Sequence, residues 1–274
     1  MFATRRSPRS AALAATLAFV ALVGPLAACA GGDGVTGTND QEQTHTTPPP
    51  DNAAGIVTGT VVDTRGQPLA GVKVIADNTL FYNTNVIGYT DARGHYKLDV
   101  SGVVGTWHMT AHLAREFNGQ TFDLYLHPNS DAPFAGTERA VRNFEWRLTG
   151  PRADGLGSYG GNIQFIIDQQ GWATNAHQTD VEFTLTPVGP LIDGSAGKTL
   201  TVRANYDWYT VRDLPIGQYK ITARYAPDGQ APRPMVLRWY GQGNYVDTLT
   251  PTWPGVGYGG VLGFLDLQVT APQN

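Results

Sequence analysis

The sequence is poor in cysteine: Cys29 is the only one among 274 residues. The chain therefore has no internal disulfide and no pair of thiolates for a structural zinc site. Because Cys29 lies near the N-terminus, before every segment with a strand pattern, the folded domains also lack a thiolate nucleophile. Enzymes that use a cysteine nucleophile or a cysteine-ligated zinc ion are therefore excluded.

Charge is also scarce, and positive charge in particular. Only 15% of the residues are charged, with 19 basic against 23 acidic side chains. Three of the basic residues are Arg5, Arg6 and Arg9, and without them 16 basic residues face 23 acidic ones, a formal net charge of −7. Binding to phosphate backbones needs clustered positive charge. Nucleic acid is therefore not an expected partner.

Motifs for covalent catalysis are missing as well. No Gly-x-Ser-x-Gly segment occurs, so the sequence contains no nucleophile elbow of the hydrolase type. Carboxylate pairs assembled from distant strands remain open, and nothing local points to one. The sequence leaves enzymatic activity undecided and favours a non-catalytic protein.

The N-terminus has the three parts of a signal peptide. Arginines are followed by an uncharged run at 11–24 and by Leu26-Ala-Ala-Cys29. The apolar run is shorter than the roughly 18 to 20 residues that span a bilayer, which disfavours a retained transmembrane helix. The alternative is an ordinary secretory signal cleaved nearby, which would leave Cys29 as a stray thiol.

Leu-Ala-Ala-Cys resembles a bacterial lipobox. The resemblance implies removal of residues 1–28, lipidation of the Cys29 thiol and acylation of the new amino terminus. Ala30 in place of Asp is similar to lipoproteins sent to the outer membrane where the host has one. The expected location is therefore outside the cytoplasm, lipid-anchored to the cell envelope, with a membrane as partner.

After the anchor, composition favours a flexible segment and then strands. Residues 29–54 hold the lipidated cysteine and a polar stretch with Pro48-Pro-Pro50, which predicts a disordered tether. Beyond it, 33 Gly, 18 Pro and abundant Thr, Val and Tyr favour short strands joined by tight turns. We predict an all-β fold of two consecutive antiparallel β-sandwich domains, at 55–150 and 151–274.

The first predicted domain contains three recognisable sequence motifs. They are Gly59-Thr-Val-Val-Asp63, Gly66-Gln-Pro-Leu-Ala-Gly71-Val72 and Thr90-Asp91-x-x-Gly94-x-Tyr96. Together they resemble the carboxypeptidase regulatory-like domain, a sandwich of the transthyretin (prealbumin) type, over about 55–148. The resemblance implies a non-catalytic module, since the peptidase domain that some such modules accompany has no counterpart here.

The second domain is predicted from its alternating segments. They lie at 161–167, 180–186, 198–203, 219–225 and 234–240, and a second sandwich is the simplest account of them. Leu214-Pro-Ile-Gly-Gln-Tyr219 is similar to a turn that is common in related surface domains. Whether the second domain repeats the fold of the first stays open.

Three histidines form one candidate site. If Asn118-Gly119 makes a two-residue hairpin turn, His112 lies opposite Tyr125, and His108, His112 and His127 share one face of the strand pair. Imidazoles at that spacing suit copper or zinc. The alternative is an ordinary solvent-facing surface on which three histidines coincide by chance. No cofactor is established by the sequence, and copper or zinc at these histidines stays a hypothesis.

Aromatic residues form the other candidate site. Many of them crowd the C-terminal part, several in Gly/Asn/Asp-rich loops, and those in loops are the better candidates for stacking on sugar rings: Tyr245, Trp253 and Tyr258. The alternative is that they fill the core. From this we expect a non-catalytic binding or structural module of the envelope, which recognises a glycan or another surface protein. The competing interpretation is a metal-binding protein or metal-dependent enzyme, and a third is a purely structural spacer.

Overall fold

The computed structural model describes residues 53–204, 210–255 and 263–273. By its contacts the chain divides into 1–47 and 48–274, and all described residues lie in the second unit. The predicted signal peptide, Cys29 and most of the tether therefore lie outside the described residues. No helix in the described ranges has the length and apolar character needed to cross a bilayer.

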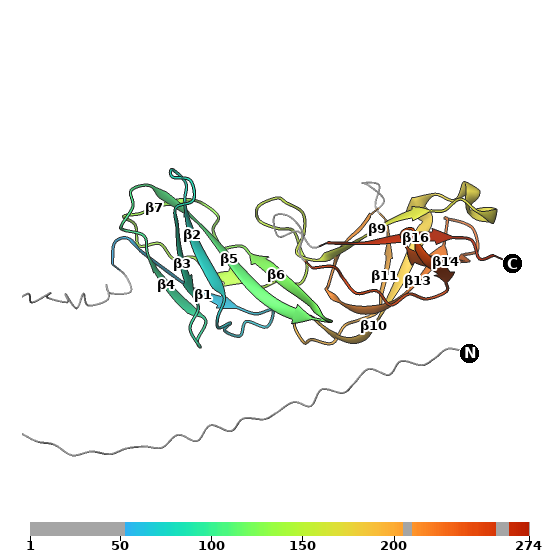
Figure 1. Cartoon of the computed structure of the whole chain (residues 1–274), viewed down its shortest axis with the longest axis horizontal. Helices are drawn as coiled ribbons and strands as arrows, with labels where there is room; N and C mark the ends of the chain where they lie inside the picture. Colours follow the sequence, from blue (N-terminus) through green and yellow to red (C-terminus); the bar gives the residue numbers. More distant parts are fainter. Residues whose placement is uncertain (1–52, 205–209, 256–262, 274) are drawn as a thin grey trace, which may run out of the picture. The chain divides into compact units, whose positions relative to one another are not determined.

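The described chain is built almost entirely of strands (Figure 1), which confirms the predicted all-β class. We call the first eight strands the N-terminal sheets. They are β1 (Ile56–Val62), β2 (Lys73–Asn78), β3 (Asn85–Tyr89), β4 (His95–Asp99), β5 (Thr106–Phe117), β6 (Gln120–Leu126), β7 (Phe134–Ala135) and β8 (Phe144–Glu145).

The N-terminal sheets form two layers. One has the order β4-β1-β8, and the other has the order β3-β2-β5-β6, with β7 added on β5. All pairings are antiparallel except β1 with β8, which is parallel and was not predicted. Alternating residues of both layers are buried in one hydrophobic core, among them Val57 and Tyr96 from the first layer and Trp107 and Met109 from the second.

The remaining eight strands form what we call the C-terminal sheet. They are β9 (Gly161–Ile167), β10 (Val181–Leu191), β11 (Leu200–Arg203), β12 (Thr210–Leu214), β13 (Gly217–Tyr225), β14 (Arg233–Trp239), β15 (Gln242–Val246) and β16 (Phe264–Thr270), with two short 3-10 helices at Gly171–Asn175 and Gln178–Asp180. Strands β12, β15 and β16 were not among the predicted segments.

The C-terminal sheet is continuous and packs on itself. Its order is β11-β10-β13-β14-β16-β9-β12, with β15 on β14. Phe165 on β9 and Phe183 on β10 lie far apart along this order, yet their rings meet edge to face with centroids 4.9 Å apart. The sheet must therefore curl so that its two ends enclose a common core. Within this order, β9 pairs with β16 in parallel.

Every strand pairing among the described residues joins strands within one of these two sets. The boundaries at 55–150 and 151–274 themselves stay a proposal. Hydrogen bonds to β12 hold the segment between the two sets of strands. The Asp213 carboxylate accepts them from the backbone amides of Gly150 and Gly160. Asp213 has a φ of 63°, a left-handed conformation that aspartate tolerates better than most residues.

Candidate functional site

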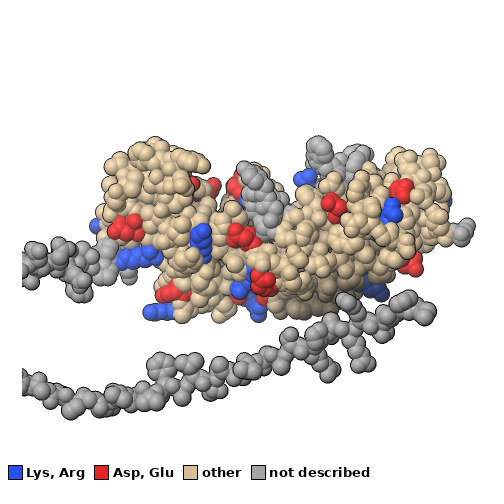
Figure 2. Space-filling view, in the orientation of Figure 1, with Lys and Arg blue, Asp and Glu red and all other residues tan. Residues whose placement is uncertain are grey.

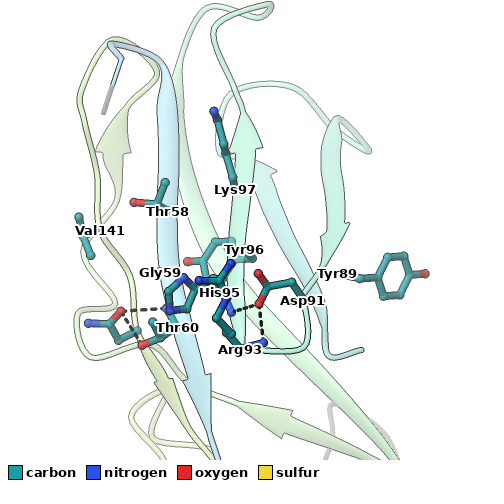
Figure 3. A pocket seen from close by; sticks show the side chains of 11 residues that line it. Thr58, Gly59, Thr60, Tyr89, Asp91, Arg93, His95, Tyr96, Lys97 and Val141 are labelled. Carbon is teal, nitrogen blue, oxygen red and sulfur yellow. Dashed lines mark hydrogen bonds between the residues drawn. The ribbon is translucent and has the colours of Figure 1, made fainter. Parts of the chain in front are cut away.

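A polar groove runs over the outer face of the β4-β1-β8 layer (Figure 3). It has a volume of about 670 Å³. The strand register explains its composition, because alternate residues of each strand face outward. Thr58 lies opposite Lys97 and Thr60 lies opposite His95, so hydroxyls of β1 alternate with basic side chains of β4.

Hydrogen bonds fix one wall of this polar groove. The backbone amide and the hydroxyl of Thr60 both donate to Oδ1 of Asn143, over 3.0 and 3.2 Å. The backbone amide of Asn143 donates in turn to Oδ1 of Asn129, over 2.9 Å. Because Oδ1 of Asn143 is committed to Thr60, its amide NH₂ is the end left for a ligand.

The other wall is the tight turn from β3 to β4. Oδ1 of Asp91 accepts the backbone amides of Arg93 and His95, over 2.8 and 2.9 Å. These two hydrogen bonds lower the pKa of Asp91 from its ordinary value of 3.8, so the carboxylate stays ionised and is turned toward the backbone. In Figure 3, Arg93 and His95 lie beside that carboxylate and Lys97 extends along the sheet away from the turn.

A smaller cavity of about 370 Å³ adjoins this groove, and the two share Thr60 and Asn143. His127 and Tyr159 line it, together with residues of the segment that follows β8. The loop after β6 also lines this cavity, through His127, Pro128 and Asn129.

The three predicted histidines are all partly exposed; His108 and His112 lie on β5, and His127 directly follows the end of β6. Each of them, however, faces its own carboxylate. His108 Nε2 lies 2.6 Å from Asp131, His112 Nδ1 lies 3.1 Å from Asp123, and His127 Nε2 lies 3.5 Å from Asp154. Within the ranges that the structure describes, no three His, Cys, Asp or Glu side chains are grouped to hold a metal ion. The three-histidine metal site remains a prediction that this arrangement does not support.

His127 is the most enclosed of the three, with a side chain 8% exposed. Burial lowers the pKa of His127 from 6.5, and the nearby Asp154 only partly offsets this effect. Asp154 itself is paired with Arg152, whose side chain is 3% exposed. Burial alone would raise the pKa of Asp154, but the hydrogen bonds from Arg152 and from the Leu156 amide hold it below 3.8. At neutral pH the cluster thus contains a neutral imidazole beside a buried ion pair.

Of the three aromatic residues predicted to stack on sugar rings, the structure describes Trp253 and Tyr245. Trp253 is 2% exposed, and its indole N–H donates to the carbonyl of Gly217 over 2.8 Å, so it is a core residue. The prediction that Trp253 stacks on a sugar ring is therefore wrong. Although Trp253 lies in a loop, its side chain packs into the hydrophobic core. Tyr258 lies outside the described residues.

Tyr245 is half-buried and already engaged. Its hydroxyl donates to Asp168 over 2.8 Å, and the Arg238 guanidinium lies 4.4 Å from its ring centre. Burial, together with Asp168, raises the pKa of Tyr245 to about 12. A sugar would have to displace Arg238 to use that face of the ring. The binding role of Tyr245 stays a prediction.

Sequence reasoning missed the polar groove. Its residues come from three separate segments, and the Asp-x-x-Gly turn at 91–94 was the one signal that singled out any of them. That turn was identified for its fold rather than for its side chains. Asn143 lies in a stretch with no strand pattern, so its place beside Thr60 follows only from the parallel pairing of β1 with β8.

Comparisons with families and with curated proteins do not identify a relative of this chain. No family model matches the chain, and no curated protein matches it significantly. The resemblance of 55–148 to the carboxypeptidase regulatory-like domain therefore stays a prediction.

Among solved structures, the chain is similar to the TIE protein of Bacillus anthracis (13% identity, 80% of this chain, 34% of that one, TM-score 0.30). It is also similar to a streptococcal ancillary pilin (14%, 82% and 64%, TM-score 0.25) and to a C-terminal fragment of the pilus adhesin SpaC from Lactobacillus rhamnosus GG (11%, 80% and 98%, TM-score 0.27). The chain thus spans about a third of the first protein and 64% of the second. TM-scores this low establish neither a common arrangement of the whole chain nor a common function.

Proposed function

We propose that this chain is an exported, lipid-anchored envelope protein whose folded part is a non-catalytic module that binds an acidic glycan in the polar groove. The observation that carries the proposal is the composition of that groove. Threonine hydroxyls and an asparagine amide occupy one side, and the basic side chains of Arg93, His95 and Lys97 occupy the other.

A glycan suits this surface better than an apolar ligand does. Thr58 can both donate and accept hydrogen bonds, as sugar hydroxyls can. The Thr60 hydroxyl, which donates its proton to Asn143, can still accept one, and the Asn143 amide adds donors. The groove is an open sheet face rather than an enclosed cavity, so a chain of sugars can lie along it. Arg93 and Lys97 carry full positive charges, which favour carboxylate or phosphate groups on the ligand.

The anchor is proposed on the N-terminal sequence alone. Leu26-Ala-Ala-Cys29 after an apolar run predicts lipidation, and three acyl chains would hold the protein stably at a membrane. Labelled palmitate should be incorporated into the wild-type chain when it is expressed in a bacterium. The Cys29→Ser variant should incorporate none and should leave the membrane fraction.

Glycan binding is tested with immobilised acidic and neutral glycans and with isolated envelopes. We expect the double variant Arg93→Gln/Lys97→Gln to lose binding to acidic glycans by about tenfold or more, because two charge-assisted contacts are removed. Lys198→Gln/Lys220→Gln removes the same charge from the exposed surface of the C-terminal part and is the matched control.

Equal losses in the two double variants would mean that net charge alone governs binding, which would refute a groove-specific site. Envelopes treated with periodate should lose binding, whereas envelopes treated with protease should keep it. The reverse pattern would replace the glycan by a surface protein as the ligand.

A further inference from the structure

Four large apolar side chains stand exposed at one end of the N-terminal sheets. They are Leu80, Phe81 and Tyr82 in the β2–β3 loop and Val104 in the β4–β5 loop, with exposures of 65%, 51%, 101% and 83%. We call these four residues the apolar tip. Single exposed apolar residues are ordinary, but a group of this size at one end of a domain indicates a surface that meets another apolar phase.

The two loops of the apolar tip touch each other. The side-chain amide of Asn78 donates to the carbonyl of Val104 over 3.3 Å. A Cβ placed on Gly105 would lie 3.2 Å from Leu80, which shows how closely the loops approach. The four side chains therefore form one surface rather than two separate ones.

Buried polar contacts fix the shape of the β2–β3 loop. Asn78 is 5% exposed, and its Oδ1 accepts the backbone amides of Leu80 and Phe81, over 2.9 and 3.1 Å. Asn83 adopts a left-handed φ of 55°, which completes the turn. A loop held in this way cannot turn its apolar side chains inward, so their exposure is built into the fold.

The chain enters the N-terminal sheets at the same end. Gly55 accepts a hydrogen bond from the amide of Val100, and a Cβ on Gly55 would lie 2.5 Å from Ser101. Both partners belong to the loop that ends at Val104 and Gly105. Figure 1 shows the first described residues and the β2–β3 hairpin at this end. In Figure 2 the upper part of this end is drawn mostly in tan, whereas acidic and basic side chains lie where the described chain begins.

We propose that the apolar tip inserts into the surface of the lipid bilayer in which the chain is anchored. The inference rests on the proposed anchor at Cys29, because residues 30–52 are all that separates that anchor from the described end of the chain. The disordered tether predicted from the sequence, treated as a flexible coil of that length, would span roughly 25 Å, short enough to keep the apolar tip near the membrane. Leu80, Phe81 and Val104 supply apolar surface, and the ring and hydroxyl of Tyr82 suit the interface between acyl chains and headgroups.

Insertion has a consequence for the proposed ligand site. The apolar tip lies at the β1 start and β4 end, whereas the turn that carries Asp91 and Arg93 lies at the opposite end of β4. With the apolar tip in the bilayer, that turn would point away from the membrane, where an envelope glycan can reach it.

The test uses the lipidated full-length chain in liposomes of phosphatidylethanolamine and phosphatidylglycerol. Because the native Cys29 would be acylated, a cysteine introduced by Tyr82→Cys or Val104→Cys is the single site for an environment-sensitive fluorophore. Val188→Cys labels an equally apolar exposed position on β10, 52% exposed, and serves as the control. We expect the labels at 82 and 104 to emit at shorter wavelength and to be quenched by brominated acyl chains, and the label at 188 to do neither.

Labels at 82 and 104 that behave like the label at 188 would overturn the proposal. A shift to shorter wavelength without quenching would also overturn it, since it would place the apolar tip against protein rather than lipid. The anchor is tested separately by the incorporation of labelled palmitate, a readout that does not depend on the apolar tip.

A second measurement does not depend on the anchor. The mature chain with Cys29→Ser should sediment weakly with the same liposomes, and Leu80→Ser/Phe81→Ser should lower its partition coefficient by about tenfold or more. Val141→Ser/Leu156→Ser, at two exposed apolar positions elsewhere, should leave it unchanged. Equal partition of both double variants would refute insertion even if Cys29 is lipidated.

Discussion

His112 lies directly opposite Tyr125 across the β5–β6 hairpin, with ring centroids 4.0 Å apart. The pair follows from the turn at Asn118 and Gly119, whose φ angles of 49° and 75° are those of a two-residue hairpin turn. Such a turn fixes the register of every residue pair behind it. The predicted register is therefore confirmed at His112 and Tyr125. The shared face of His108, His112 and His127 stays a prediction, because His127 lies just beyond the end of β6.

That register does not by itself bring the three imidazole rings together around a metal ion. Register sets the position of Cα and Cβ atoms, whereas the direction of an imidazole depends on what it meets beyond the sheet. His108 and His127 each turn to a carboxylate from a following segment, at Asp131 and Asp154. Neither carboxylate belongs to a segment with a strand pattern, so its place beside a histidine could not be predicted from the sequence.

The first prediction concerns zinc and copper. Because each histidine already has a separate carboxylate partner, we expect calorimetric titration of the mature chain to show no one-to-one binding of micromolar affinity or tighter. One-to-one binding that is lost in His108→Ala/His112→Ala would contradict this expectation and would make the three-histidine metal site the leading hypothesis. His177→Ala, at an exposed position on the C-terminal part, is the matched control.

The second prediction concerns pH. The pKa of His127 is lower in the folded protein than the 6.5 of the unfolded chain. The unfolded state therefore binds a proton first as the pH falls, so the free energy of unfolding should be constant above about pH 7 and should decrease as the pH falls through 6.5 toward the folded pKa. The slope from one such group is at most about 1.4 kcal/mol per pH unit.

The groups that face His127 are Asp154, Arg152, Asp131, His108 and Tyr159. Their charges change the size of the pKa shift of His127 but not its direction, because burial is the largest cause of the shift. His127→Gln should flatten the slope between about pH 7 and pH 5 in urea denaturation, and His177→Gln should not. If the free energy of unfolding of His127→Gln still falls as steeply with pH, another titrating group must cause the pH dependence.

Turns were the part of the fold that the sequence predicted best. Asp63 and Asp91 each begin an Asp-x-x-Gly turn, and in both the carboxylate accepts two backbone amides while the glycine, Gly66 or Gly94, has a positive φ. The chemistry of such a turn is complete within five residues, so a local pattern specifies it. The binding surfaces are different, because they depend on which strands become neighbours.

The polar groove and the apolar tip illustrate that limit. The groove needs β1 to lie between β4 and β8, and a parallel pairing of β8 over two residues leaves no periodic signal. In the apolar tip, Leu80-Phe81-Tyr82 reads in the sequence as a short apolar run, which equally fits a buried strand. Only the hydrogen bonds of the buried Asn78 decide that these side chains face outward.

The third prediction concerns Gly59, in the middle of β1. A Cβ at this position would lie 1.8 Å from the carbonyl oxygen of Arg142 and 2.8 Å from the ring of Tyr96. We expect Gly59→Ala to lower the free energy of unfolding by at least about 3 kcal/mol, because backbone must move to admit the methyl group. It should also weaken ligand binding, since Thr58 and Thr60 flank it in the polar groove.

Gly66→Ala is the control for Gly59→Ala. Gly66 has a φ of 76° but open space around it, so alanine there should cost only about 1–2 kcal/mol of backbone strain. Equal midpoints of urea denaturation for the two variants would mean that β1 separates easily from the segment at 142, and that this wall of the groove is not rigid.

The last prediction separates the structural role of Trp253 from a binding role. Trp253→Phe removes the indole N–H that satisfies the buried carbonyl of Gly217 and leaves part of the indole volume empty. An unsatisfied buried carbonyl costs about 1–3 kcal/mol, and the lost packing adds to it, so we expect a loss of about 2–4 kcal/mol in the free energy of unfolding. Tyr240→Phe, at a ring 55% exposed, should cost less than about 0.5 kcal/mol.

Glycan affinity then distinguishes the two roles of Trp253. Below the unfolding transition, Trp253→Phe should bind glycan as the wild type does, because its ring is enclosed beside Gly161 and Ile216 rather than presented to solvent. If instead affinity falls while the unfolding midpoint stays unchanged, Trp253 must leave the core to meet the ligand. The binding site would then lie on the C-terminal sheet rather than in the polar groove.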